Sequence, residues 1–240
     1  MKIALLISGH CRTFVYEEQR VFFEKLIKYL KTFGYCDTYV MLKTDPMMQT
    51  DKGIFQLEKM IKMLSPVYSI AFKEWKQHDN NCYYSQMRMI RHLVDTAHNY
   101  DYYIRIRPDC IIPNLQEIQI KNLCTSNIYT SRKFDSIGND QFFIMSQKIV
   151  KEWFLKLSII PMKVSPEYYI FNEVTTQIKC QVIQSIKSGL VRDYKRIESW
   201  NSRHSHLNIK DWLPKQTFVS IPYELYINKL KNIIHYQEVI

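Results

Sequence analysis

The sequence predicts an α/β domain in which helices flank a mostly parallel central sheet, with a C-terminal extension. Residues 3–7 form a continuous apolar run, which is typical of a strand buried on both faces of a parallel sheet. Strand-like runs then alternate with stretches of helical periodicity, joined by short links. Residues 102–106 are aromatic and β-branched, and the following Arg107-Pro108 predicts that this strand stops there, because proline cannot donate to a ladder.

Each expected element has a local signal. The helix beginning at Glu17 has acids in its first turn, helical apolar spacing and Gly34 as its expected C-cap. Ser165-Pro166-Glu167 is typical of a helix start. The expected strands are residues 3–7, 37–42, 67–72, 102–106, 127–130 and 141–145, and the expected helices are residues 17–33, 54–64, 83–98, 148–157 and 165–179. We expect one domain over residues 1–195 and an extension over 196–240 that packs on it.

The composition excludes some classes of protein. Lys and Arg outnumber the acids 33 to 23 in the 240 residues, and the net charge of +10 favours anionic partners. The basic residues are spread along the chain, which argues against a nucleic-acid partner. Six cysteines without a CxxC pair argue against a zinc knuckle or a disulfide scaffold. With no signal peptide and no run near the ~18 apolar residues of a membrane span, we expect a cytoplasmic protein.

Three charged residues follow the strand 102–106 or lie within it. Arg105, Arg107 and Asp109 would stand at the carboxyl end of the sheet, where open α/β folds bind ligands. Arginine pairs suit phosphate, and a carboxylate beside phosphate suits Mg²⁺ or Mn²⁺. The alternative is an Arg–Asp ion pair that only holds a loop.

The loop after the first strand is the second candidate. Gly9 would let the backbone approach a ligand closely, and Arg12 adds a charge that could reach a phosphate. The alternative is a tight turn without a ligand. No GxGxxG follows this strand, so the dinucleotide-binding fingerprint is absent.

In order, the chain shows Ser-Gly-x-x-Arg after the first strand, Tyr-Asp-x-x-Ile-Arg-x-Arg-x-Asp at the fourth, Asp-Gln-Phe, and Pro-Glu before a helix. This series, between about Lys2 and Lys179, resembles nucleotide-sugar glycosyltransferases of GT-A type, in particular the polysaccharide and viral-glycan branch, and implies their Rossmann-like GT-A fold. If the protein is viral, the expected location is the host cytoplasm.

The resemblance also implies roles. Ser8, Gly9 and Arg12 would hold the nucleotide, with Arg12 near the diphosphate, and Asp109 would bind a divalent metal, Mn²⁺ or Mg²⁺. The residues themselves suggest Arg105 and Arg107 as further contacts to the nucleotide-sugar, since arginine pairs suit phosphate. His204 and His206 could add ligands to the metal; the alternative is two exposed loop histidines. The donor would be a nucleotide-sugar, with UDP- or GDP-sugars favoured, and the acceptor a glycan or another hydroxyl compound.

The chain departs from the family's Asp-x-Asp motif, because Arg107 stands where the first aspartate would be. A departing nucleoside diphosphate must be stabilised by a metal or by fixed cations. Arginine could therefore replace part of the metal's work.

An inverting transfer needs a general base near the acceptor hydroxyl. Asp140 and Glu167 are the candidates; their alternatives are an Asx-turn residue and a helix-dipole residue. Two other functions stay open: a catalytically degenerate glycan- or nucleotide-binding module of this fold, and a basic nucleic-acid-binding protein. Donor base, sugar, acceptor, linkage, stereochemistry and oligomeric state do not follow from the sequence.

Overall fold

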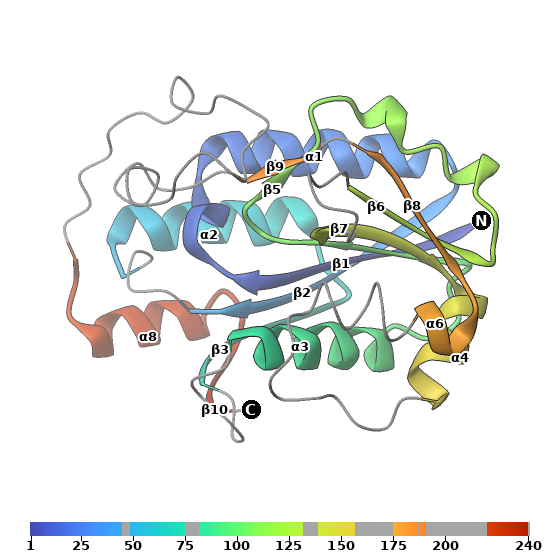
Figure 1. Cartoon of the computed structure of the whole chain (residues 1–240). Coiled ribbons are helices and arrows are strands. Elements are labelled where there is room, and N and C mark those ends of the chain that lie inside the picture. Colours follow the sequence, from blue (N-terminus) through green and yellow to red (C-terminus); the bar gives the residue numbers. More distant parts are fainter. Residues whose placement is uncertain are drawn as a thin grey trace, which may run out of the picture.

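The computed structural model describes residues 1–44, 49–74, 82–131, 139–156, 175–186, 188–190 and 220–239. Figure 1 shows a layered α/β arrangement, with α1 and α2 on one face of the central sheet and α3 and α4 on the other. The helices are α1 (Glu17–Lys31), α2 (Asp51–Leu64), α3 (Cys82–Thr96), α4 (Gln147–Lys156), α6 (Thr175–Ile178) and α8 (Tyr223–Lys231). The short 3-10 helices are η1 (Arg12–Val15), η3 (Leu115–Glu117) and η4 (Ile120–Asn122).

The central sheet is mostly parallel. Its eight strands run in the order β10-β3-β2-β1-β4-β7-β6-β8, and a second sheet pairs β5 with β9. The strands are β1 (Lys2–His10), β2 (Tyr35–Lys43), β3 (Tyr68–Glu74), β4 (Tyr102–Ile106), β5 (Cys110–Ile111), β6 (Asn127–Ser131), β7 (Asn139–Ser146), β8 (Gln181–Ile186), β9 (Gly189–Leu190) and β10 (His235–Val239). Only the pairs β4–β7 and β6–β7 are antiparallel in this sheet. The predicted fold class is confirmed.

The two faces of the sheet carry separate cores because side chains alternate along each strand. Ile3, Leu5 and Ile7 of β1 pack with α1 and α2, whereas Ala4 and Leu6 pack with α3 and α4. The central strands are therefore buried on both sides, as the continuous apolar run predicts. This arrangement leaves the carboxyl ends of β1 and β4 side by side.

The predicted elements up to residue 156 are confirmed, with ends that shift by a few residues. One detail differs: α1 ends at Lys31 with Thr32 as its C-cap, and Gly34 lies beyond it. Gly34 has φ +149°, and a Cβ there would lie 2.2 Å from the Met1 carbonyl oxygen. Glycine is therefore required by the close approach of the N-terminus, not by the helix cap.

The C-terminal segment enters the main sheet. β10 pairs with β3 in parallel, and α8 contributes Tyr226, Ile227 and Leu230 to the core shared with α1 and α2. Ser220 forms a bridge to Thr50, the residue whose hydroxyl caps α2. The expected boundary at residue 195 and the helix expected to begin at residue 165, apart from α6, lie outside the described residues. No helix in the described ranges is long and apolar enough to cross a membrane.

Candidate functional site

The candidate site lies where β1 and β4 end. The two strands are parallel neighbours, with Ile7 opposite Ile106, so the residues that follow each strand meet at one edge of the sheet. Ser8 and Gly9 come from β1, and Arg107, Pro108 and Asp109 follow β4. We call this region the mouth. Chain regions about a hundred residues apart thus meet at one edge of the sheet, where an open α/β fold binds its ligands; Arg107 is partly exposed there, and the other four residues are buried.

Gly9 is held against the loop after β4. Its φ is +147°, and a Cβ at this position would lie 2.9 Å from Cδ of Pro108. Any other residue would therefore be strained in its backbone and would collide with the proline ring. The glycine lets the end of β1 approach the loop after β4 at the mouth, which is a packing requirement of this chain itself.

Arg105 lies beneath the mouth and is completely buried. Its Nε–H donates to Oγ of Ser8 and its Nη2–H to the Ser8 carbonyl, both at 3.3 Å. The guanidinium also lies 5.9 Å from the centre of the Phe143 ring. Arg105 therefore positions Ser8 from inside the protein, and it is not exposed where the expected contact with a nucleotide would require it to be.

Arg107 and Asp109 form a bidentate ion pair. Arg107 Nε–H donates to Oδ1 of Asp109 and Nη2–H donates to Oδ2, both at 2.9 Å. The Asp109 side chain is 2% exposed and the Arg107 side chain 18%. Both carboxylate oxygens thus accept from one guanidinium, a geometry that is specific and strong. The ion pair that the sequence left as an alternative is present.

β7 completes the mouth on the other side of β4. Because β7 is antiparallel to β4, its first residues lie beside the end of β4, and the Arg107 amide donates to the Gln141 carbonyl at 2.9 Å. The backbone of Asp140 immediately precedes Gln141, so Asp140 belongs to the strand end at the mouth. Its side chain lies outside the described residues.

Two short strands extend the mouth in a way that sequence reasoning missed. Cys110 of β5 pairs with Leu190 of β9, which brings residues 189–190 next to Asp109. Two-residue strands carry no periodicity, so no sequence signal identifies them. Burial, with the Asp109 carboxylate nearby, raises the pKa of the Cys110 thiol to about 12. The thiol stays protonated at neutral pH and is not a nucleophile.

Other predicted site residues fall outside the described part. Arg12 begins η1 directly after the mouth loop, but its side chain is not described. Glu167, His204 and His206 lie in the ranges 157–174 and 191–219, which the structure does not describe. Ser8, Gly9, Arg107 and Asp109 are thus brought together, and Arg105 supports them from below.

The mouth, as described, does not fit a divalent metal held by Asp109. Each carboxylate oxygen of Asp109 accepts one hydrogen bond from Arg107, and the lone pairs that remain lie on a side chain that is 2% exposed, beside a guanidinium that repels a divalent cation. Within the described ranges no group of three or more His, Cys, Asp or Glu side chains could hold a metal. A divalent ion on Asp109 would therefore lie next to the Arg107 guanidinium, and the two positive charges would repel each other.

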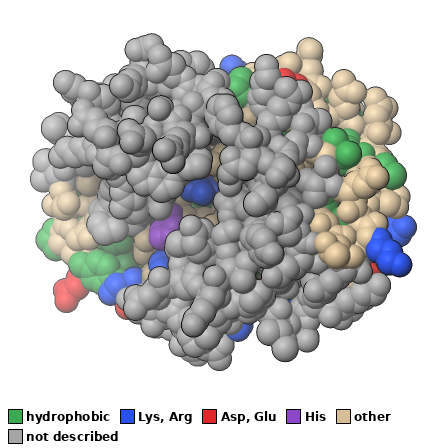
Figure 2. Space-filling view, in the orientation of Figure 1, with side chains coloured by type: hydrophobic (Ala, Val, Ile, Leu, Met, Phe, Trp, Pro, Cys, Tyr) green, Lys and Arg blue, Asp and Glu red, His purple; other side chains and the backbone are tan. Residues whose placement is uncertain are grey.

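Figure 2 shows a basic side chain and a histidine near the centre of the face seen in Figure 1, among described residues. The other Lys and Arg side chains on this face lie in separate places and form no continuous patch among the residues coloured by type. A hollow of about 320 Å³ between α2 and α8 is lined by residues that include Phe55 and Lys229, and none of the predicted site residues line it.

No family model matches the sequence, and no curated protein matches it. Solved structures with similar folds include a mutant of Drosophila β-1,4-galactosyltransferase 7 in complex with manganese, UDP-Gal and xylobiose, at 12% identity and a TM-score of 0.49 over 90% of this chain and 82% of that chain. A glycosyltransferase involved in glycosylation of the PBCV-1 major capsid is 11% identical, with a TM-score of 0.43 over 77% of this chain and 81% of that chain. The inositol-1-phosphate CTP transferase of T. maritima is 9% identical, with a TM-score of 0.47 over 96% of this chain and 95% of that chain. Likeness at this level does not extend to activity.

Proposed function

We propose that the protein is a GT-A-type glycosyltransferase that moves a sugar from a nucleotide-sugar donor to a hydroxyl group of a glycan or another acceptor. The observation that carries the proposal is the mouth itself. An arginine with part of its surface exposed, held by a buried carboxylate, stands at the carboxyl ends of two parallel strands, beside Ser8 and Gly9 of β1. Fixed cations at such an edge suit the diphosphate of a nucleotide donor.

The chemistry of sugar transfer explains why a cation would be needed there. As the bond from the anomeric carbon to the diphosphate breaks, negative charge grows on the leaving oxygen. Preorganised positive groups stabilise that charge without reorganisation at the moment of reaction. Arg107 is such a group, because Asp109 fixes its plane with two hydrogen bonds. Arg12, which begins the 3-10 helix after Gly9, is proposed to add a second cation.

The acceptor hydroxyl loses a proton in the transfer. In an inverting reaction a carboxylate within hydrogen-bond reach accepts that proton. We propose Asp140 for this role, since its backbone belongs to the end of β7 next to Arg107. Glu167 is proposed to stand near the acceptor. The proposed donor is a UDP- or GDP-sugar and the proposed acceptor a glycan, as the resemblance implies.

The test is a transfer assay with the purified chain. UDP-, GDP-, CDP- and dTDP-sugars are first screened for a thermal shift, because a ligand at ~100 times its Kd stabilises a fold by about 2.7 kcal/mol. A donor that shifts the melting temperature is then incubated with and without glycan acceptors, and release of the nucleoside diphosphate is measured. Release that rises with an acceptor supports the proposal. A screen in which no nucleotide-sugar binds would overturn it.

A second candidate is a binding module of the same fold that holds a nucleotide or glycan without turnover. The observation that favours it is Arg107 in place of an acidic metal ligand, paired to the remaining aspartate. The same assay separates the two. Binding without release of nucleoside diphosphate, with any of the acceptors, favours the module.

A further inference from the structure

The Arg107–Asp109 pair puts a guanidinium where an Asp-x-Asp motif would hold a metal. We propose that this pair replaces the divalent metal at the mouth: Arg107, oriented by Asp109, is the group that receives the diphosphate, so nucleotide binding requires neither Mn²⁺ nor Mg²⁺. The inference rests on the proposed function and deepens it, because it states how the same site handles the charge of its donor.

The geometry of the pair supports this assignment. Both hydrogen bonds measure 2.9 Å, each to a different carboxylate oxygen, and the residues are only two positions apart on one loop. Asp109 is 1% exposed, so water competes little for its oxygens. A buried carboxylate that keeps both hydrogen bonds to a guanidinium is a poor metal ligand, because the metal would have to reach its remaining lone pairs beside a fixed positive charge.

The charges of the pair also disfavour a metal ion at Asp109. Together the carboxylate and the guanidinium are neutral, so the pair attracts a divalent cation far less than a bare aspartate would. If the metal displaced Arg107, a guanidinium would remain beside a doubly charged ion in a buried site. Like charges at such a distance repel strongly where the dielectric constant is low. Arg107 and a metal on Asp109 are therefore alternatives to each other.

The pair exposes its positive member to a ligand. The Arg107 side chain is 18% exposed, whereas Asp109 and Arg105 are buried. An incoming anion at the mouth therefore meets the guanidinium and not the carboxylate. The guanidinium is already oriented by Asp109, and the Arg107 backbone is fixed because its amide N–H donates a hydrogen bond to the Gln141 carbonyl. In this arrangement Asp109 is a positioning residue, which acts on the ligand only through Arg107.

The experiment measures nucleotide and metal binding separately on the full chain. The protein is stripped with EDTA, and the dissociation constants of UDP and GDP are measured by calorimetry in EDTA and again with Mn²⁺. In parallel, the electron paramagnetic resonance signal of free Mn²⁺ is followed as protein is added, and a sample of Mn²⁺ with nucleotide but no protein is the control. We expect the dissociation constants in the two buffers to agree within about twofold. We also expect the protein to remove no more of the Mn²⁺ signal than the nucleotide removes by itself.

Variants of Arg107 and Asp109 test whether these two residues carry nucleotide binding. Arg107→Met should weaken the nucleoside diphosphate about tenfold to a hundredfold in both buffers, as the loss of charge-assisted hydrogen bonds predicts. Asp109→Asn should weaken it equally in EDTA and in Mn²⁺, since it loosens Arg107. Arg107→Lys, which keeps the charge but not the fork, should recover part of the affinity. The wild-type comparison alone tests the proposal if a variant fails to fold.

The outcomes are distinguishable. Wild-type binding that requires Mn²⁺ would overturn this inference while leaving the glycosyltransferase proposal intact, and loss of that Mn²⁺-dependent binding in Asp109→Asn would show that Asp109 is a metal ligand. If neither nucleotide binds in either buffer, the proposed function loses its support at the donor site, and the inference fails with it. Equal binding in both buffers supports both.

Discussion

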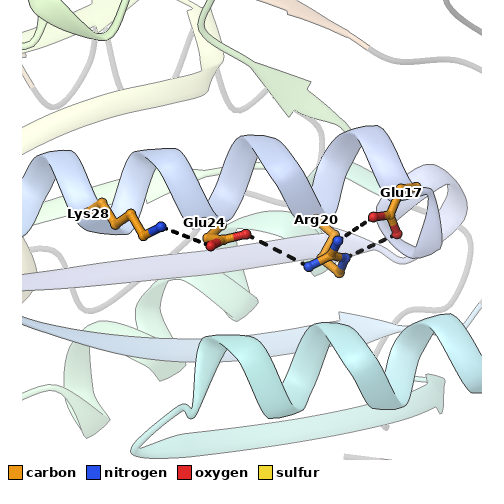
Figure 3. Close-up of polar contacts among 4 residues, drawn as sticks. All are labelled: Glu17, Arg20, Glu24 and Lys28. Carbon is orange, nitrogen blue, oxygen red and sulfur yellow. Dashed lines mark hydrogen bonds and ion pairs between the residues drawn. The ribbon is translucent and has the colours of Figure 1, made fainter.

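The same residue chemistry occurs in two very different places in this molecule. On α1, Glu17, Arg20, Glu24 and Lys28 form a chain of ion pairs along one exposed side of the helix (Figure 3). At the mouth, Arg107 and Asp109 form a bidentate pair. The helix pairs leave 28–75% of their side-chain surfaces exposed, whereas the Asp109 side chain is 2% exposed.

Environment, not the number of contacts, decides what these pairs do. Exposed pairs interact through water, are screened by salt and contribute little to stability. A buried pair gains more attraction, but it has also lost its hydration, so that removing one partner leaves the other uncompensated. The α1 pairs thus contribute little to stability, whereas the mouth pair fixes a charge in space. Only the second kind suits a site for a charged ligand.

The largest difference between the two regions should appear when one carboxylate is removed from each. We expect Asp109→Ala to lower the free energy of unfolding by about 3 kcal/mol, the lower end of the range for a broken buried pair, because Arg107 is partly exposed. Glu24→Ala is the matched control, and we expect its unfolding curve to overlay the wild type. Urea unfolding followed by circular dichroism measures both. Equal effects of the two variants would contradict the comparison.

Gly9 tests whether the mouth is also held by packing. Gly9→Ala should lower the free energy of unfolding by about 2 kcal/mol, because alanine is strained at φ +147° and its Cβ would lie 2.9 Å from Cδ of Pro108. The double variant with Pro108→Ala removes the collision but keeps the backbone strain. It should therefore recover only part of the loss, measured relative to Pro108→Ala alone in the same urea titration. Full recovery would show that the backbone conformation costs nothing.

Ser8 joins the two strands through the buried arginine. Ser8→Ala removes the hydroxyl that accepts from Arg105 Nε, at 3.3 Å, but leaves the carbonyl contact. We expect a loss of about 1 kcal/mol in the free energy of unfolding, since the bond is long although its donor is charged. Ser8→Thr, which keeps a hydroxyl, is the control. A Ser8→Ala variant as stable as the wild type would show that Arg105 holds the loop through the carbonyl alone.

The sequence predicted most of the fold because its signals are local. Apolar runs and helical spacing between residues 3 and 106 depend on neighbours a few positions away, and the strand 102–106 was predicted with the bounds of β4. β10 was not predicted, because its five residues have little apolar pattern and are fixed by pairing with β3, far away in the sequence. β5 and β9 were missed for the same reason.

The site was harder to predict, because what matters there is burial. Arg105 and Arg107 look alike in the sequence, two positions apart at a strand end. The structure buries the first under Ser8, 97 residues earlier in the chain, and leaves the second partly exposed. No local pattern separates the two, since arginine is usually an exposed residue. The Arg107–Asp109 pair, in contrast, was foreseen as an alternative because its partners are close in sequence.

The smallest expected effect concerns the exposed pairs, and it depends on pH. The hydrogen bond from Arg20 holds the pKa of Glu17 below its ordinary value of 4.5. A carboxylate with a lowered pKa in the folded protein contributes stability above the unfolded value, and this contribution is lost as the pH falls through the folded pKa. The wild type should therefore exceed Glu17→Gln slightly in stability at neutral pH, and the difference should vanish in acid.

Salt should erase this difference in stability at every pH, because the pair is exposed, whereas the loss caused by Asp109→Ala should persist in salt. Urea titrations of Glu17→Gln, Asp109→Ala and the wild type at low and high salt measure these differences in the free energy of unfolding. If salt erased the effect of Asp109→Ala as well, the mouth pair would be energetically no different from the pairs on α1.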